Sequence, residues 1–119
     1  MRTKRTNPDF LNGVPEMLIL RLVSRQPMYG YEIVQAIRDA TGGAIEFGEG
    51  CVYPILHRLE AEGLLSNKRQ SVAGRSRVVY RITAKGTKQS AETMQTWKQV
   101  MSAIQQALHG GEDGQPALA

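Results

Sequence analysis

Apolar residues recur every three or four positions in three segments of the first half of the chain, which is the pattern of buried helical faces. The first segment predicts a helix over residues 14–25. The second predicts a helix that starts near Tyr29 and ends at the Thr41-Gly42-Gly43 sequence. The third predicts a helix that starts near Glu49 and stops at Gly63, where a left-handed residue is expected.

The period changes after this third segment. Residues 64–70 and 77–83 have the composition of two strands, joined by a loop over residues 71–76. In the second strand three apolar residues alternate with Arg77, Val79 and Arg81. The alternation predicts one apolar face and one largely cationic face. We therefore expect a β-hairpin with basic residues at its tip and along its outer face.

A long last helix is predicted from a Thr83 cap to about Leu108. Its apolar residues are separated by 3, 4, 3 and 4 positions, as on the seam of a coiled coil: Met94, Trp97, Met101, Ile104 and Leu108. Two interpretations stay open, because this seam can pack against the first helix or against a second copy of the chain. Trp97 and its Met neighbours also suit an apolar cavity for a planar ligand, since methionine adapts to varied shapes.

The distribution of charge singles out the hairpin. The 119 residues include 15 Lys and Arg against 11 Asp and Glu, a formal net charge of +4. Residues 63–91 contain no acidic residue, but seven basic ones: Lys68, Arg69, Arg75, Arg77, Arg81, Lys85 and Lys88. A local surplus of this kind suits a polyanionic partner such as DNA, and a solvated basic surface is the alternative.

These elements predict a mainly α chain with a small β-hairpin, an α+β fold. We expect a flexible basic arm over residues 1–12, a winged helix-turn-helix over 13–83, a dimerisation helix over 84–108 and a disordered tail over 109–119. The third helix would enter the major groove, and the hairpin would reach phosphates or the minor groove. No signal-peptide or bilayer-spanning pattern is present, so we expect a cytoplasmic protein.

Three motifs resemble the PadR family of transcriptional regulators. Residues 27–33 (Pro-Met-Tyr-Gly-Tyr-Glu-Ile) resemble the entry to that family's second helix, residues 49–65 resemble its recognition helix, and residues 77–86 are similar to its second wing strand. The resemblance covers residues 14–108 and implies a homodimeric, DNA-binding repressor. It also implies control by a small molecule, as in many members of the family. For a small member with a tryptophan in the last helix, it also implies binding of drugs or aromatic compounds. Cys51 departs from the family pattern, which has Thr or Ser at this position.

We expect DNA contacts from the second helix, the third helix and the wing: Tyr29, Tyr31, Gly50, Cys51, Tyr53, Pro54, His57, Arg58, Arg75 and Arg77. Some of these residues also have a structural interpretation. Pro54 would fix the first helical turn, Tyr53 would pack under the hairpin, and His57 would be an exposed imidazole. A thiol in the first turn of a helix has a lowered pKa, so a redox-sensitive Cys51 is weighed against a small side chain beside the groove.

The sequence shows no constellation typical of an enzyme or of a cofactor site. Glu60 and Glu62 are two positions apart on a helix and point in different directions, and His57 has no second metal ligand at a useful spacing. We predict a repressor that reads a near-palindromic operator as a homodimer and is released by a small aromatic or drug-like effector. The alternative is a winged-helix module that docks on an acidic protein without sequence-specific DNA binding.

Overall fold

The computed structural model describes residues 13–110. Within them lie four helices and a three-stranded antiparallel sheet: α1 (Val14–Arg25), β1 (Met28–Tyr29), α2 (Gly30–Ala40), α3 (Glu49–Ala61), β2 (Leu65–Val72), β3 (Arg75–Ile82) and α4 (Ala84–His109). The predicted α+β class and the predicted bounds of the first helix are confirmed. The basic arm predicted over residues 1–12, and residues 111–119 of the predicted tail, lie outside the described residues.

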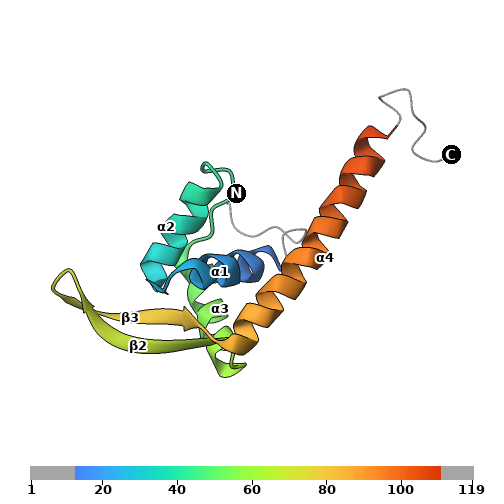
Figure 1. Cartoon of the computed structure of the whole chain (residues 1–119). Coiled ribbons are helices and arrows are strands. Elements are labelled where there is room, and N and C mark those ends of the chain that lie inside the picture. The colour runs from blue at the N-terminus through green and yellow to red at the C-terminus, as the bar shows by residue number, and fades with distance from the viewer. Residues whose placement is uncertain (1–12, 111–119) are drawn as a thin grey trace.

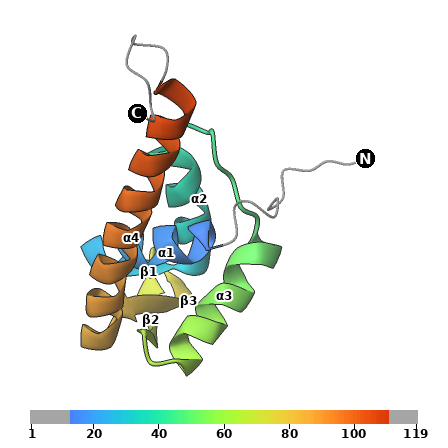
Figure 2. The ribbon, with the colours of Figure 1, turned by 90° about the vertical axis from the view of Figure 1, so that its right-hand side faces the viewer.

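The core lies between α1, α2, α3 and the base of the hairpin (Figures 1 and 2). Helix-spaced residues such as Ile19, Ile37 and Leu56 are completely buried there. The connection between α2 and α3 also contributes to the core, because Phe47 is only 2% exposed. Thr41 fastens this connection, since its hydroxyl donates to the Ile37 carbonyl (3.0 Å) and accepts from the Ile45 N–H (3.0 Å).

The hairpin formed by β2 and β3 is longer than predicted. Its pairs run from Leu65↔Ile82 to Val72↔Arg75, so the loop expected over residues 71–76 is wrong and only Ala73 and Gly74 form the turn. Their φ angles of 53° and 81° are both positive. Two positive φ angles are those of a type I′ turn, whose twist matches the twist of the paired strands and keeps them together to the tip.

The third strand, β1, was not predicted from the sequence. Its two residues pair with β3 at Met28↔Tyr80 and Tyr29↔Val79. Val79 is 4% exposed, although the alternation placed it on the solvated cationic face. That face is therefore cationic only in part, and the base of the wing is packed against the body of the protein.

Helix α4 begins at the predicted cap and then leaves the body of the protein (Figure 1). The Thr83 hydroxyl accepts from the Gly86 N–H at 3.0 Å, and the helix ends at His109, one residue beyond the predicted end. Met94 and Trp97 are partly buried where α4 passes α1. Beyond this point the apolar residues Val100, Met101, Ile104 and Leu108 are 43–66% exposed. The predicted seam therefore packs on α1 at its start and is uncovered at its end.

Candidate nucleic-acid interface

Helix α3 presents a broad face to solvent. Gly50, Pro54 and His57 share this face at a spacing of four and three residues, and all three are exposed. The opposite face, with Val52, Leu56 and Leu59, is completely buried. A side-chain carbon added at Gly50 would meet no atom within 4 Å, so the first turn of α3 projects freely. A free first turn is what a recognition helix needs, since its N-terminal part approaches the base edges.

Tyr53 lies on the wing side of α3 and packs against the start of α2. A methyl group at Gly30 would overlap the Tyr53 ring, so the two helices are in direct contact at this point. The ring is partly buried, which agrees with the packing role considered for Tyr53. Burial and the nearby Glu49 carboxylate raise the pKa of Tyr53, because both disfavour the phenolate, and Arg77 opposes them. The hydroxyl is therefore protonated at neutral pH and can donate a hydrogen bond.

A crevice of about 310 Å³ separates α3 from the wing. Its lining includes Tyr29, Tyr53, His57, Arg69, Arg77 and Tyr80. No carboxylate lines it, and the side chains offer two guanidinium groups, an imidazole and phenolic hydroxyls. Guanidinium groups bind phosphates through charge-assisted hydrogen bonds, so the crevice has the chemistry of a phosphate site.

Arg77 is held deep in this crevice. Its guanidinium carbon lies 4.5 Å from the centroid of the Tyr29 ring, as in a cation–π contact. Its Nε is buried and has no hydrogen-bond partner among the described residues. Arg75, which pairs with Val72 beside the turn, is exposed. Arg77 lies two residues further along β3, where it pairs with Gln70.

Arg58 lies on the other side of α3 and joins it to α1. Its guanidinium donates to the Glu16 carboxylate at 2.7 Å and to the Glu62 carboxylate at 3.3 Å. The hydrogen bond to Glu16 is the main cause that raises the pKa of Arg58. A contact between Arg58 and DNA stays a prediction, and it would have to compete with these two ion pairs.

Cys51 is partly buried in the first turn of α3. Burial raises the pKa of its thiol, because the charged thiolate is poorly solvated there. The pKa of Cys51 is therefore shifted in the direction opposite to the expected lowering, and desolvation is the cause.

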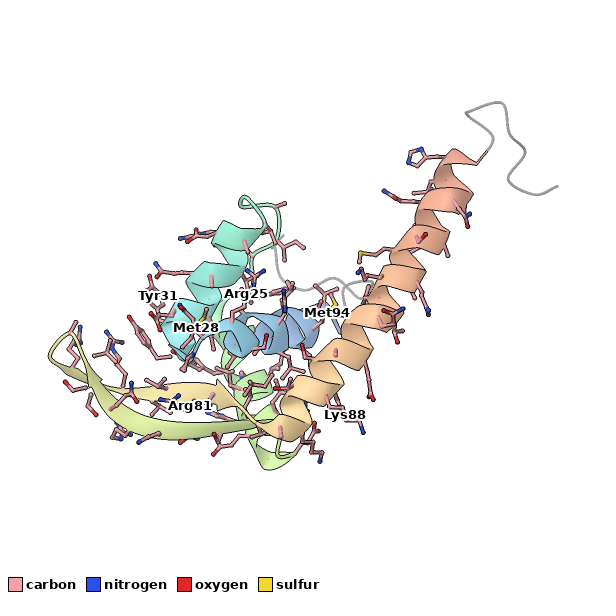
Figure 3. The ribbon with its side chains drawn as sticks, viewed as in Figure 1. Arg25, Met28, Tyr31, Arg81, Lys88 and Met94 are labelled. Carbon is pink, nitrogen blue, oxygen red and sulfur yellow. The ribbon has the colours of Figure 1, made fainter. Side chains whose placement is uncertain are left out.

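Tyr31 is 45% exposed near the start of α2, above the wing in the view of Figure 3. Tyr29 is partly buried, and its backbone N–H donates to the Glu32 carboxylate at 3.0 Å. The two tyrosines therefore differ in accessibility, a difference that the sequence left undecided.

A comparison with protein families decides the class of this protein. The model of the "Transcriptional regulator PadR-like family" matches residues 19–92, which run from α1 through the wing into α4. The chain belongs to this family. Transcriptional regulator Rv3488 of Mycobacterium tuberculosis is 43% identical to it over 78 residues, which cover 66% of this chain and 70% of that relative.

Solved structures of PadR-like proteins share the fold. A PadR-like transcriptional regulator from Bacillus cereus has a TM-score of 0.74 at 32% identity, covering 84% of this chain and 96% of the other. The protein smu.1704 from Streptococcus mutans has a TM-score of 0.75 at 34% identity, covering 82% and 88%. The PadR-like family consists of DNA-binding transcriptional regulators with a winged helix, and it is not a family of enzymes.

In this PadR-like protein, three residues of the candidate interface were not predicted as site residues: Glu16, Arg69 and Ser76. Arg69 donates to the Ser76 hydroxyl at 3.3 Å and belongs to the acid-free segment, which was the available signal. No sequence pattern could indicate the role of Glu16, because its partner Arg58 is 42 residues away. Among residues 13–110, no group of three His, Cys, Asp or Glu residues could hold a metal ion. No helix in this range is long and apolar enough to cross a membrane.

Proposed function

We propose that this PadR-like protein is a cytoplasmic repressor that binds a near-palindromic operator as a homodimer. The observation that carries the proposal is the free first turn of α3 beside an acid-free, basic wing. The α3 face with Gly50, Pro54 and His57 enters the major groove. Arg75, at the exposed tip, contacts phosphate or the minor groove of the same site.

The crevice between α3 and the wing supports the same orientation. A DNA strand that passes between these two elements places a phosphate near Arg69 and Arg77. Tyr53 donates a hydrogen bond to this phosphate from the α3 side. Tyr31 reaches the DNA backbone from the start of α2. On the side of α3 away from Tyr53, Cys51 and Arg58 flank the face that enters the groove. Cys51 approaches the groove there, and Arg58 approaches a phosphate.

The homodimer is supported by the uncovered end of the α4 seam. Helix α1 covers the seam at Met94 and Trp97 only. Beyond them the seam continues with exposed side chains: Met101, Ile104 and Leu108. A second copy of α4 buries these side chains, which removes an apolar stripe from water. The paired helices then hold two α3 helices about 34 Å apart, one turn of DNA.

Control by a small aromatic or drug-like effector is the second part of the proposal. The seam changes from covered to uncovered within two turns of α4. These two turns contain Met94, Trp97 and Met101. An effector that binds one geometry of the dimer better than another changes the spacing of the two reading helices. The operator is then released.

Selection of bound fragments from genomic DNA, followed by gel shifts, tests this function. We expect an inverted repeat whose half-sites are about one helical turn apart, and much weaker binding to a scrambled sequence of equal length. Binding without any sequence preference would support the alternative, a module that docks on an acidic protein. The same selection, repeated with planar cations and phenolic acids, tests the effector.

A further inference from the structure

The end of α3 and the start of α4 meet at the base of the wing (Figure 1). Thr83, the cap of α4, makes the first contacts between them. Its hydroxyl donates to the Gly63 carbonyl at 2.7 Å, and its backbone N–H donates to the Leu64 carbonyl at 3.1 Å. Because the same hydroxyl accepts from the Gly86 N–H at 3.0 Å, one side chain both caps α4 and fastens it to the end of α3.

Lys85 adds a charged contact between the two helices. Its ammonium group donates to the carbonyl of Glu62, the C-cap residue of α3, at 2.9 Å. The last carbonyls of a helix have no partner within the helix, and a cation there also complements the helix dipole. Lys85 belongs to the acid-free segment, whose surplus of charge suits a polyanionic partner. In the structure its charge is directed at α3 instead.

Gly86 makes the contact between the helices close. The residue is buried, and a side-chain carbon added to it would overlap the backbone carbonyl of Leu64. A backbone group cannot rotate away as the end of a flexible side chain can. The first turn of α4 therefore lies this near the end of α3 only because residue 86 is glycine. Thr83, Lys85 and Gly86 together form the α3–α4 joint.

The joint differs in kind from the attachment of α4 to α1. Where α4 passes α1, Met94 and Trp97 are partly buried by packing. Apolar packing has no preferred direction, whereas hydrogen bonds depend on angle as well as distance. The hydrogen bonds of the joint and the close approach at Gly86 therefore fix the direction of α3 relative to α4.

We propose that the α3–α4 joint determines the half-site spacing that the protein accepts in an operator. In the proposed homodimer the two subunits meet through the exposed end of α4. The position of each α3 relative to its partner therefore depends on the angle between α3 and α4. Thr83, Lys85 and Gly86 are positioning residues, which act through α3 and touch no phosphate or base. The inference rests on the proposed function and adds to it the residues that set the spacing.

The first test compares operators whose half-sites are moved closer together or further apart by single base pairs. The wild type should prefer one spacing by about tenfold or more. Lys85→Met keeps the length of the side chain and removes the donor. This variant should bind the preferred operator about three- to tenfold more weakly and lose most of its preference. Lys85→Arg retains a donor and should restore the preference.

The salt dependence of binding separates positioning from direct contact with DNA. In Lys85→Met the slope of log K against log salt should equal that of the wild type, because a lost phosphate contact lowers it by about 0.9. Lys88→Met is the matched control, since Lys88 is an exposed lysine of the same helix, on its outer side in Figure 3. It should keep the spacing preference of the wild type.

The second test needs no DNA. Trp97 is the single tryptophan and Cys51 the single cysteine of the chain, so Cys51→Ser with His57→Cys leaves one exposed thiol on α3 for an acceptor dye. Time-resolved energy transfer from Trp97 then measures the distance between α4 and α3. Lys85→Met should broaden the distribution of this distance. Gly86→Ala should shift its mean, because the start of α4 and the Leu64 carbonyl have to separate.

Lys85 is exposed, so Lys85→Met still decides the matter if Gly86→Ala does not fold. An unchanged spacing preference in Lys85→Met, or a salt slope lower by about 0.9, would overturn the proposal. Distance distributions equal to that of the wild type in both variants would overturn it as well. A wild type without sequence-specific binding would refute the proposed function, and the energy transfer would still show whether the joint holds α3 against α4.

Discussion

The guanidinium of Arg77 stacks 4.5 Å from the centroid of the Tyr29 ring, and this contact joins the wing to the strand that leads into α2. Arg75, only two residues closer to the turn, is exposed. Two basic residues of one strand therefore have different environments, and their replacement should have different consequences.

Arg75→Ala should weaken operator binding and leave stability unchanged. Each lost phosphate contact lowers the slope of log K against log salt by about 0.9. Arg77→Ala should also reduce the free energy of unfolding, by about 0.5–1 kcal/mol, because the cation–π contact is lost. Fluorescence anisotropy at several salt concentrations and urea denaturation measure the two effects. Lys88→Ala is the control, and an unchanged slope in Arg75→Ala would remove the wing tip from the DNA contact.

Gly30→Ala should destabilise the protein although alanine favours helices. The added methyl group overlaps the Tyr53 ring, so the ring or α3 has to shift from its packed position. Overpacking of this kind costs about 1–3 kcal/mol. Gly50→Ala is the matched control, because an added carbon there meets nothing within 4 Å. Its free energy of unfolding should stay the same or rise by up to about 1 kcal/mol. Equal denaturation midpoints for the two variants would contradict the packing described for Tyr53.

Ile104→Glu and Leu108→Glu should convert the proposed dimer into a monomer. Both side chains belong to the exposed end of the seam, at 51% and 66% exposure, and a charge buried in a dimer interface is strongly unfavourable. Sedimentation equilibrium gives the mass of each variant. Gln105→Glu and Gln106→Glu introduce the same charge beside the seam and should stay dimeric. A wild-type monomer at micromolar concentration would exclude the dimer and the spacing derived from it.

The thiol of Cys51 should react slowly at neutral pH. Because burial raises its pKa, the thiol stays protonated in the folded protein. The folded state favours the protonated thiol, and the stability that results is lost as the pH rises through the raised pKa. The rate of alkylation by iodoacetamide should therefore still be rising above pH about 8.5, the usual thiol pKa. The protein unfolded in urea is the control and should level off earlier. A plateau near pH 7 would show an activated thiol instead.

Local patterns were sufficient to predict the helices. The spacing of apolar residues gave α1 with its observed bounds, and the Gly63 stop is real, with φ of 79°. The pattern could not reveal β1, because a strand of two residues exists only through its pairing with Tyr80 and Val79. The wing turn was misplaced for a related reason. Both faces of the hairpin are exposed near its tip, so no alternation marks the strand residues there.

The candidate interface was predicted as a set of residue types, without their geometry. Charge placed the basic residues on the wing, but the distinction between Arg75 and Arg77 depends on Tyr29, which lies in another strand. In the same way, the ion pair between Arg58 and Glu16 joins residues 42 positions apart. Contacts of this kind depend on the tertiary packing of α1 and the sheet, so the sequence alone could not place them.

Helix α4 also acts as a lever arm. From Met94, where it passes α1, to its end at His109, it extends about 22 Å at 1.5 Å per residue. A rotation of about 10° at that fulcrum displaces the far end by roughly 4 Å, which exceeds the 3.4 Å rise of one base pair. In the proposed dimer, a small tilt of α4 is therefore enough to shift one α3 helix by a single base-pair step relative to the other, while α3 itself keeps its shape.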